Sequence, residues 1–219
     1  MTPQETKQQQ LAETLALAPV VPVVIIDEVA HAVPMARALV AGGIRAIEVT
    51  LRTPAALEAI RAIAAEVEGA VVGVGTVLDG YQLEAARQAG ARFAVSPGAS
   101  PKLLDAADAG ELPLLPGVAT AGEAMSLLER GYRHLKFFPA VPAGGHKLLG
   151  AWASPLPQIR FCPTGGISLS SAPDFLGLPN VVCVGGSWLT PADKLKAGDW
   201  AGIELLAREA AGLASNRRS

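Results

Sequence analysis

The 219-residue sequence has few aromatic residues, few charges and little cysteine. Aromatic residues make up 5% of the chain and charged residues 17%, and there are two cysteines. Cysteines this few, embedded in apolar runs, exclude a disulfide framework or a zinc knuckle. The net charge of -2 does not provide the basic surface that nucleic acids or anionic membranes attract. No apolar run of the sequence reaches the roughly 18 residues of a membrane-spanning helix.

Aliphatic residues are abundant instead. Half of the residues are hydrophobic, and the mean hydropathy is +0.34, which excludes an intrinsically disordered chain. The N-terminal segment MTPQETKQQQ is polar and does not have the basic-then-apolar order of a signal peptide. The sequence therefore predicts a cytoplasmic α/β protein, with no nucleic acid or membrane as its main partner.

Short β-branched runs recur at a steady interval along the chain. They begin near Val20, Ala46, Ala70, Phe93, Leu112, His134, Ile159 and Val181. Continuous apolar runs are typical of parallel strands buried on both faces, and the alanine-rich stretches between them have the spacing of helices. This alternation favours a single-domain (β/α)8 TIM barrel over an open doubly wound sheet. The barrel is expected to span 1–219, with an extra N-terminal helix in 1–17 and a frayed tail in 213–219.

Lys136 is the first candidate for chemistry. It lies in the apolar run His-Leu-Lys-Phe-Phe-Pro, at the end of a predicted strand, where barrels place their active sites. Burial away from water favours the neutral amine, which can attack a carbonyl and form a Schiff base. The alternative is a strand-end lysine that extends its ammonium group into water. Lys147 is a weaker candidate, because the stretch around it resembles a helix and is expected to face solvent.

Glu48 and Arg52 follow each other at the end of the second predicted strand. A carboxylate inside a strand suits proton transfer, and a guanidinium fork suits the carboxylate of a substrate. The alternative for both residues is an ion pair between them. Thr76 offers a hydroxyl to the same substrate carboxylate, or alternatively caps the helix that follows it.

Glycine pairs follow the last two predicted strands, in Thr164-Gly165-Gly166 and Gly185-Gly186-Ser187. Barrels frequently bind phosphate between these two loops, although glycine also serves simple tight turns. The three histidines are scattered, and none is spaced from an acidic residue as metal ligands are. Neither a metal nor a cofactor is expected.

Seven segments together resemble the 2-keto-3-deoxy-6-phosphogluconate (KDPG) aldolases, a family that includes the 4-hydroxy-2-oxoglutarate aldolases. They are EVTLRT (48–53), GVGTV (73–77), SPG (96–98), LPGVAT (115–120), KFFPA (136–140), RFCPTGGI (160–167) and GGSWL (185–189). The resemblance runs from about residue 15 to 212. It implies a metal-free class I aldolase on a (β/α)8 barrel, typically a homotrimer, that cleaves KDPG to pyruvate and glyceraldehyde 3-phosphate.

By motif, the resemblance implies that Lys136 is the Schiff-base lysine and Glu48 the general acid/base. It places Arg52 and Thr76 at positions that bind the substrate carboxylate. The implied phosphate positions are Gly165, Gly166, Gly186 and Ser187, and the implied pocket positions are Pro97, Phe138 and Thr164.

Several alternatives remain at the level of the sequence. Thr164 matches the gluconate-type pattern rather than that of relatives acting on the galactonate epimer, and activity on 4-hydroxy-2-oxoglutarate stays open. A metal-dependent phosphosugar epimerase or lyase would need a set of His, Asp and Glu ligands at strand ends. A non-catalytic phospholigand-binding protein would use Lys136 merely as an ion-pair partner of Glu48.

Overall fold

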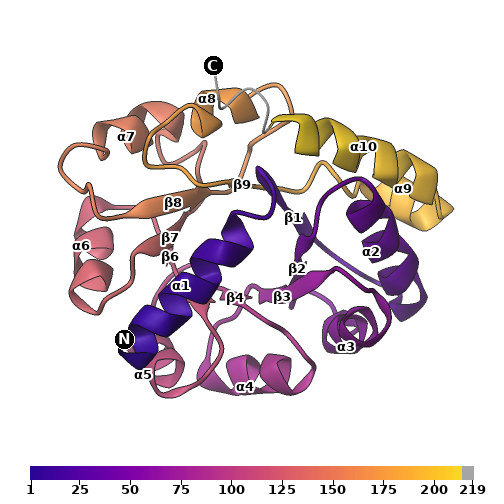
Figure 1. Ribbon diagram of the computed structural model, residues 1–219, viewed down its shortest axis with the longest axis horizontal. Coiled ribbons are helices and arrows are strands. Elements are labelled where there is room, and N and C mark those ends of the chain that lie inside the picture. Colours follow the sequence, from indigo (N-terminus) through magenta and orange to yellow (C-terminus); the bar gives the residue numbers. More distant parts are fainter. Residues whose placement is uncertain (214–219) are drawn as a thin grey trace.

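The computed structural model describes residues 1–213 and shows a curled parallel sheet with helices around its outside (Figure 1). Apart from Leu213, the predicted tail at 213–219 lies outside the described residues. The strands are β1 (Val20–Val24), β2 (Ala46–Thr50), β3 (Val71–Gly75), β4 (Ala94–Val95), β5 (Leu114–Leu115), β6 (Gly117–Val118), β7 (His134–Phe137), β8 (Arg160–Pro163) and β9 (Val184–Gly186). The helices are α1 (Pro3–Leu15), α2 (Ala32–Ala41), α3 (Ala56–Glu66), α4 (Gly80–Gln88), α5 (Pro101–Ala109), α6 (Ala121–Glu129), α7 (Gly145–Ala151), α8 (Ala172–Leu176), α9 (Ala192–Ala197) and α10 (Trp200–Gly212), with a 3-10 turn at Val29–His31 before α2.

The strands form two parallel sheets. One has six strands in the order β5-β4-β3-β2-β1-β9, and the other has three in the order β6-β7-β8. Pro116 alone separates β5 from β6, because a proline has no N–H to donate to a neighbouring strand. Isolated bridges join Phe161 to Val181 and Thr164 to Gly185, beside β8 and β9. The predicted parallel α/β architecture is confirmed.

Most predicted element positions agree with the structure. β1, β2 and β7 begin at the predicted Val20, Ala46 and His134, whereas β9 begins at Val184 rather than near Val181. Pro34 lies inside α2 without interrupting it. α2 begins at Ala32, so that Pro34 falls in its first turn, where a missing N–H costs no helical hydrogen bond.

Helix α1 lies across the N-terminal ends of the strands (Figure 1, indigo). Its Leu11 and Leu15 belong to an apolar cluster inside the curled sheet, together with Val21, Ala46, Phe93, Val95, Leu115, Cys162 and Cys183. A second, larger cluster fills the space between the sheet and the surrounding helices. α1 therefore closes one end of the interior and leaves the other end, where the strands finish, to the loops.

Two buried polar side chains fix α1 in this position. The ammonium of Lys7 donates to the carbonyls of Ala107, Asp108 and Gly110 at the C-terminal end of α5, at 2.7, 3.0 and 3.1 Å. Burial lowers the pKa of Lys7. The side-chain oxygen of Gln8 accepts hydrogen bonds from the backbone N–H groups of Arg133 and His134.

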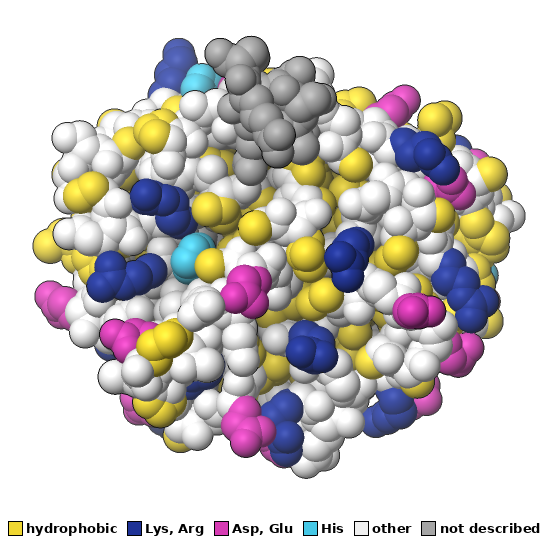
Figure 2. Space-filling view, in the orientation of Figure 1, with side chains coloured by type: hydrophobic (Ala, Val, Ile, Leu, Met, Phe, Trp, Pro, Cys, Tyr) yellow, Lys and Arg dark blue, Asp and Glu magenta, His cyan; other side chains and the backbone are white. Residues whose placement is uncertain are grey.

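Basic and acidic side chains are interspersed on the face of the molecule that carries α1, as Figure 2 shows in the same orientation. Within residues 1–213, none of the helices has the length and apolar character needed to cross a bilayer.

Candidate active site

Lys136 of β7 and Glu48 of β2 form a buried ion pair. Their side chains are 5% and 4% exposed, and Lys136 Nζ lies 3.5 Å from Glu48 Oε1. The Phe138 ring adds a cation–π contact, with its centroid 5.1 Å from Nζ. The alternative in which Lys136 extends into water is therefore wrong. Glu48 pairs with Lys136 and not with Arg52, so the alternative of a Glu48–Arg52 ion pair is also wrong.

Arg52 and Thr76 contact each other next to this pair. Arg52 Nε donates to Thr76 Oγ1 at 3.2 Å. Thr76 has a φ of 61°, a left-handed conformation that is unusual for a β-branched residue. The alternative role of Thr76 as a helix cap is wrong, because Asp79 caps α4 by accepting a hydrogen bond from the backbone N–H of Gln82.

A cavity of about 190 Å³ lies at the C-terminal ends of the strands. It is lined by Val23, Arg52, Phe138, Thr164, Gly165, Gly166, Ile167, Gly185 and Ser187. Six of the predicted site residues are thus brought together around one space: the guanidinium candidate, two pocket residues and three phosphate candidates. The ion pair adjoins this space through Phe138, which both lines the cavity and contacts the Lys136 ammonium.

The other predicted residues lie around this cavity rather than on its lining. The Trp188 indole lies against the Cα of Gly186, so Gly185 lines the cavity in place of the predicted Gly186. Pro97 lies against Gly117, which is the register partner of Lys136 in the sheet. Val23 and Ile167 line the cavity although nothing in their apolar runs distinguished them from core residues.

Strand glycines make the space that these side chains occupy. A Cβ on Gly185 would lie 2.2 Å from Thr164 Oγ1, and a Cβ on Gly117 would lie 2.4 Å from the Pro97 carbonyl carbon. A Cβ on Gly75 would likewise collide with the Glu48 side chain. Glycine inside a strand often marks such a close approach, so this signal was present in the sequence.

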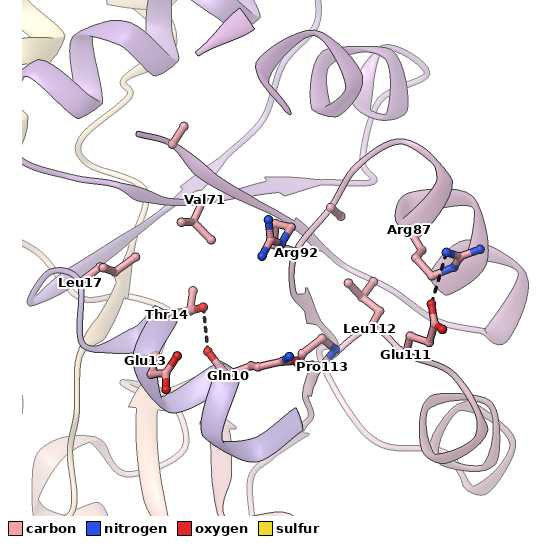
Figure 3. A pocket seen from close by; sticks show the side chains of 12 residues that line it. Gln10, Glu13, Thr14, Leu17, Val71, Arg87, Arg92, Glu111, Leu112 and Pro113 are labelled. Atoms are coloured by element: carbon pink, nitrogen blue, oxygen red, sulfur yellow. Dashed lines mark hydrogen bonds and ion pairs between the residues drawn. The ribbon is translucent and has the colours of Figure 1, made fainter. Parts of the chain in front are cut away.

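A larger cavity, of about 470 Å³, lies at the opposite end of the strands, against α1 (Figure 3). Val71, Arg92 and Pro113 line it where β3, β4 and β5 begin, and Arg87 and Glu111 form an ion pair at its edge with 3.5 Å between Nη1 and Oε2. It does not contain the Lys136–Glu48 pair. Nowhere in residues 1–213 do three or more His, Cys, Asp or Glu side chains gather as a metal site requires.

His134 begins the strand that carries Lys136, on the side of α1. Burial, with a smaller contribution from the charge of Arg160, lowers the pKa of His134 to about 4. This histidine is consequently neutral near pH 7. It lies in register with Arg160 at the start of β8, outside the cavity described above.

Comparisons with known proteins agree on one family. The family model described as "KDPG and KHG aldolase" matches residues 11–206. The KHG/KDPG aldolase of Escherichia coli K12 is 56% identical over 196 residues, which cover 90% of this chain and 92% of the relative. The 2-dehydro-3-deoxy-phosphogluconate aldolase of Dickeya dadantii is 56% identical over 198 residues, 90% of this chain and 93% of that one.

Solved structures lead to the same conclusion. The KDPG aldolase of Zymomonas mobilis ZM4, with 3-phosphoglycerate, superposes with a TM-score of 0.90 at 50% identity, covering 94% of this chain and 97% of that one. The KDPG aldolase of Legionella pneumophila, with pyruvate captured as a covalent carbinolamine, gives 0.89 at 45% identity, covering 91% and 97%. The protein is an aldolase, a lyase of carbon–carbon bonds. The chain belongs to the KDPG and KHG aldolase family.

Proposed function

We propose that the protein is a class I aldolase that cleaves KDPG to pyruvate and glyceraldehyde 3-phosphate, with Lys136 as the Schiff-base lysine and Glu48 as the general acid/base. The buried Lys136–Glu48 pair carries this proposal. An ion pair sequestered from water places a nucleophile beside a proton acceptor, which is the arrangement that Schiff-base chemistry needs. Relatives named for this activity share more than half of their aligned residues with this chain.

Binding begins at the 2-keto acid end of the substrate. Arg52 and Thr76 hold the carboxylate: Thr76 engages Nε, and the two terminal nitrogens of the guanidinium would donate to the two carboxylate oxygens. Lys136 first passes a proton to Glu48, and the neutral amine then attacks the adjacent C2 ketone to form a carbinolamine, whose hydroxyl takes that proton back from Glu48 as it leaves. Loss of water then gives a protonated imine, which withdraws electrons from the neighbouring bonds.

Cleavage follows from this electron withdrawal. Glu48, acting through a water molecule, takes the proton of the C4 hydroxyl. The C3–C4 bond breaks, its electron pair moves toward the imine, and glyceraldehyde 3-phosphate leaves a pyruvate enamine behind. Glu48 returns a proton to C3, and water hydrolyses the imine to release pyruvate and restore the Lys136 amine.

The glycine loops bind the phosphate in this proposal. Gly165 and Gly166 have φ values of 104° and 79°, so their backbone N–H groups stand in turns that side chains do not cover. Gly186 and Ser187 supply the second loop, and Pro97, Phe138 and Thr164 shape the pocket between phosphate and lysine. Thr164 favours the gluconate over the galactonate configuration. The name of the Escherichia coli relative supports 4-hydroxy-2-oxoglutarate as a second substrate.

The proposed enzyme is one (β/α)8 barrel over 1–219 that works as a cytoplasmic homotrimer without a cofactor. The one-residue break at Pro116 and the two bridges beside β8 and β9 support a closed barrel. The trimer and the cellular location rest on the family resemblance and the sequence composition.

Borohydride reduction in the presence of pyruvate tests the lysine assignment. We expect a reduced pyruvyl adduct on the peptide that contains Lys136, detected by mass spectrometry. Lys136→Ala is expected to abolish the adduct, and Lys147→Ala, which changes an exposed lysine on α7, is expected to keep it. Glu48→Gln should still form the adduct but turn over KDPG about 10²-fold more slowly. An adduct on Lys147, or none, would refute the proposal.

A further inference from the structure

The cavity of about 470 Å³ against α1 takes no part in the proposed reaction (Figure 3). We call it the α1 cavity. Gln10, Glu13 and Thr14 line it from α1, and the segments at or before the start of β3, β4 and β5 supply the other walls. Its volume falls within the range of about 300–1,000 Å³ that is typical of small-molecule sites.

Arg92 gives the α1 cavity a positive charge without a partner. Its side chain is exposed, and its guanidinium forms no hydrogen bond or ion pair with any group of residues 1–213. Figure 3 shows this guanidinium directed into the cavity, with no dashed line to the other side chains drawn. A planar guanidinium that is not already paired can bind both oxygens of a carboxylate.

The other charges of the α1 cavity limit the charge of a ligand. Arg87 is already neutralised, because its Nε and Nη2 each donate to the Glu84 carboxylate at 2.8 Å and its Nη1 lies 3.5 Å from Glu111 Oε2. Glu13 accepts a hydrogen bond from Gln9 Nε2, and no basic group of the described chain forms an ion pair with it. One unpaired guanidinium near one unpaired carboxylate favours a single negative charge over a phosphate or a dicarboxylate.

The floor of the α1 cavity is apolar. Leu17 and Val71 are partly exposed there and pack against the apolar cluster inside the curled sheet. Leu112 and Pro113 continue this surface before β5. An apolar ligand body over these side chains would extend the interior cluster and remove apolar surface from water, which favours binding.

From these features we propose that the α1 cavity is a binding site for a small-molecule monocarboxylate with an apolar body, whose carboxylate lies on Arg92 and whose body covers Leu17 and Val71. Such a ligand touches α1 and the starts of three strands at once. Because it binds the folded chain, it stabilises α1 in its docked position. The site lies at the opposite end of the strands from the Lys136–Glu48 pair, so both sites can be occupied together.

The probe is 4-phenylbutanoate, titrated into enzyme labelled with 13C in its Leu and Val methyl groups and followed by NMR. We expect the methyl signals of Leu17, Val71 and Leu112 to shift, with a Kd of about 1 mM. 4-Phenylbutanamide has the same shape without the charge and should bind about 10-fold more weakly. 4-(3-Carboxypropyl)benzoate adds a second carboxylate and should bind about 3-fold more weakly than the probe.

Two pairs of variants locate the binding. Arg92→Gln should raise the Kd of 4-phenylbutanoate by about 10-fold. Arg133→Gln is its matched control, because Arg133 is an exposed arginine just before β7, outside the α1 cavity, and should keep the wild-type Kd. Gln10→Trp, at an exposed position of α1, fills the cavity and should abolish binding, whereas Leu205→Trp on α10 should not. KDPG cleavage should stay within about 2-fold of wild type in all four.

A second measurement excludes binding at the candidate active site. Enzyme that carries the reduced pyruvyl adduct on Lys136 should bind 4-phenylbutanoate with the same Kd, because its own carboxylate position is already filled. Loss of binding in that enzyme would assign the probe to Arg52 and overturn the inference. An unchanged Kd in Arg92→Gln would overturn it as well. If no adduct forms, the proposed function fails, and the comparison of Arg92→Gln with Arg133→Gln still decides this inference.

Discussion

A Cβ atom on residue 75 would lie 2.1 Å from Oε1 of Glu48, so the glycine of β3 provides the space that the Glu48 carboxylate occupies on β2. The two residues are not register partners, since Glu48 pairs with Gly73 and Thr50 with Gly75. The same carboxylate is the one that pairs with Lys136. A methyl group at residue 75 therefore acts directly on the ion pair.

We expect Gly75→Ala to lower kcat for KDPG by at least about 10-fold, because Glu48 must move away from the position in which it transfers protons. Lys136 keeps its place, so the borohydride adduct with pyruvate should persist. Gly122→Ala is the matched control, since a Cβ there meets nothing within 4 Å on the exposed face of α6. It should keep full activity and gain about 1 kcal/mol of stability. Unchanged kcat in Gly75→Ala would contradict the role given to Glu48.

Thr76 combines an unfavourable backbone conformation with a contact to Arg52. Its left-handed φ of 61° costs about 1–2 kcal/mol of stability. Thr76→Gly would remove most of this cost, although the greater chain entropy of glycine in the unfolded state offsets part of the gain. We expect Thr76→Gly to unfold at the same or a higher urea concentration than wild type, yet to raise KM for KDPG by about 10-fold because Arg52 loses its orienting hydroxyl. Thr76→Ser should restore KM. If KM of Thr76→Ser is as high as that of Thr76→Gly, the hydroxyl does not orient Arg52.

Lys7 holds α1 against the end of α5. Lys7→Met keeps the length of the side chain but removes the donor to three carbonyls, and we expect a loss of about 2 kcal/mol in the free energy of unfolding. Activity at 25 °C should be unchanged, because these contacts lie at the opposite end of the strands from the cavity beside Lys136. Lys102→Met, at an exposed position of α5, is the control for loss of a positive charge. Equal stability of the two variants would show that the Lys7 contacts contribute nothing.

His134 makes stability depend on pH. Its pKa falls from 6.5 to about 4 on folding, so between these values the unfolded chain binds more protons than the native one. Stability from this group is complete above pH 6.5 and is lost as the pH falls through 4. We expect urea unfolding to show that wild type loses about 2 kcal/mol more than His134→Gln between pH 7 and pH 4.5. Identical losses in the two proteins would contradict the buried, neutral histidine.

The sequence predicted the alternation of strands and helices because buried parallel strands leave continuous apolar runs. It also predicted Lys136 and Glu48, since a charge inside such a run is costly unless it is paired or used. The choice between an ion pair and a free lysine depended on which two strands face each other across the interior. That relation follows from the curvature of the sheet, and spacing along the chain does not contain it.

The burial of Lys7 and Gln8 was not predicted, for a different reason. Both lie in a run of polar residues that suggests a solvated helix, and their partners are backbone carbonyls and N–H groups. Backbone atoms are the same at every residue, so a side chain that binds them leaves no complementary residue type elsewhere in the sequence. Nor could the sequence predict that Gly185, and not Gly186, lines the cavity. The Trp188 ring covers Gly186, and the position of that ring is set by packing.

The position of α1 also sets an order for folding during synthesis. Its first turns leave the ribosome before any strand exists, yet the groups that Lys7 and Gln8 bind lie 100 to 126 residues further along the chain. At about 5–20 residues per second, α1 must wait on the order of ten seconds before its docking site is made. α1 is thus translated before the elements that hold it and is among the last of them to reach its final place, with Leu11 and Leu15 open to chaperones until then.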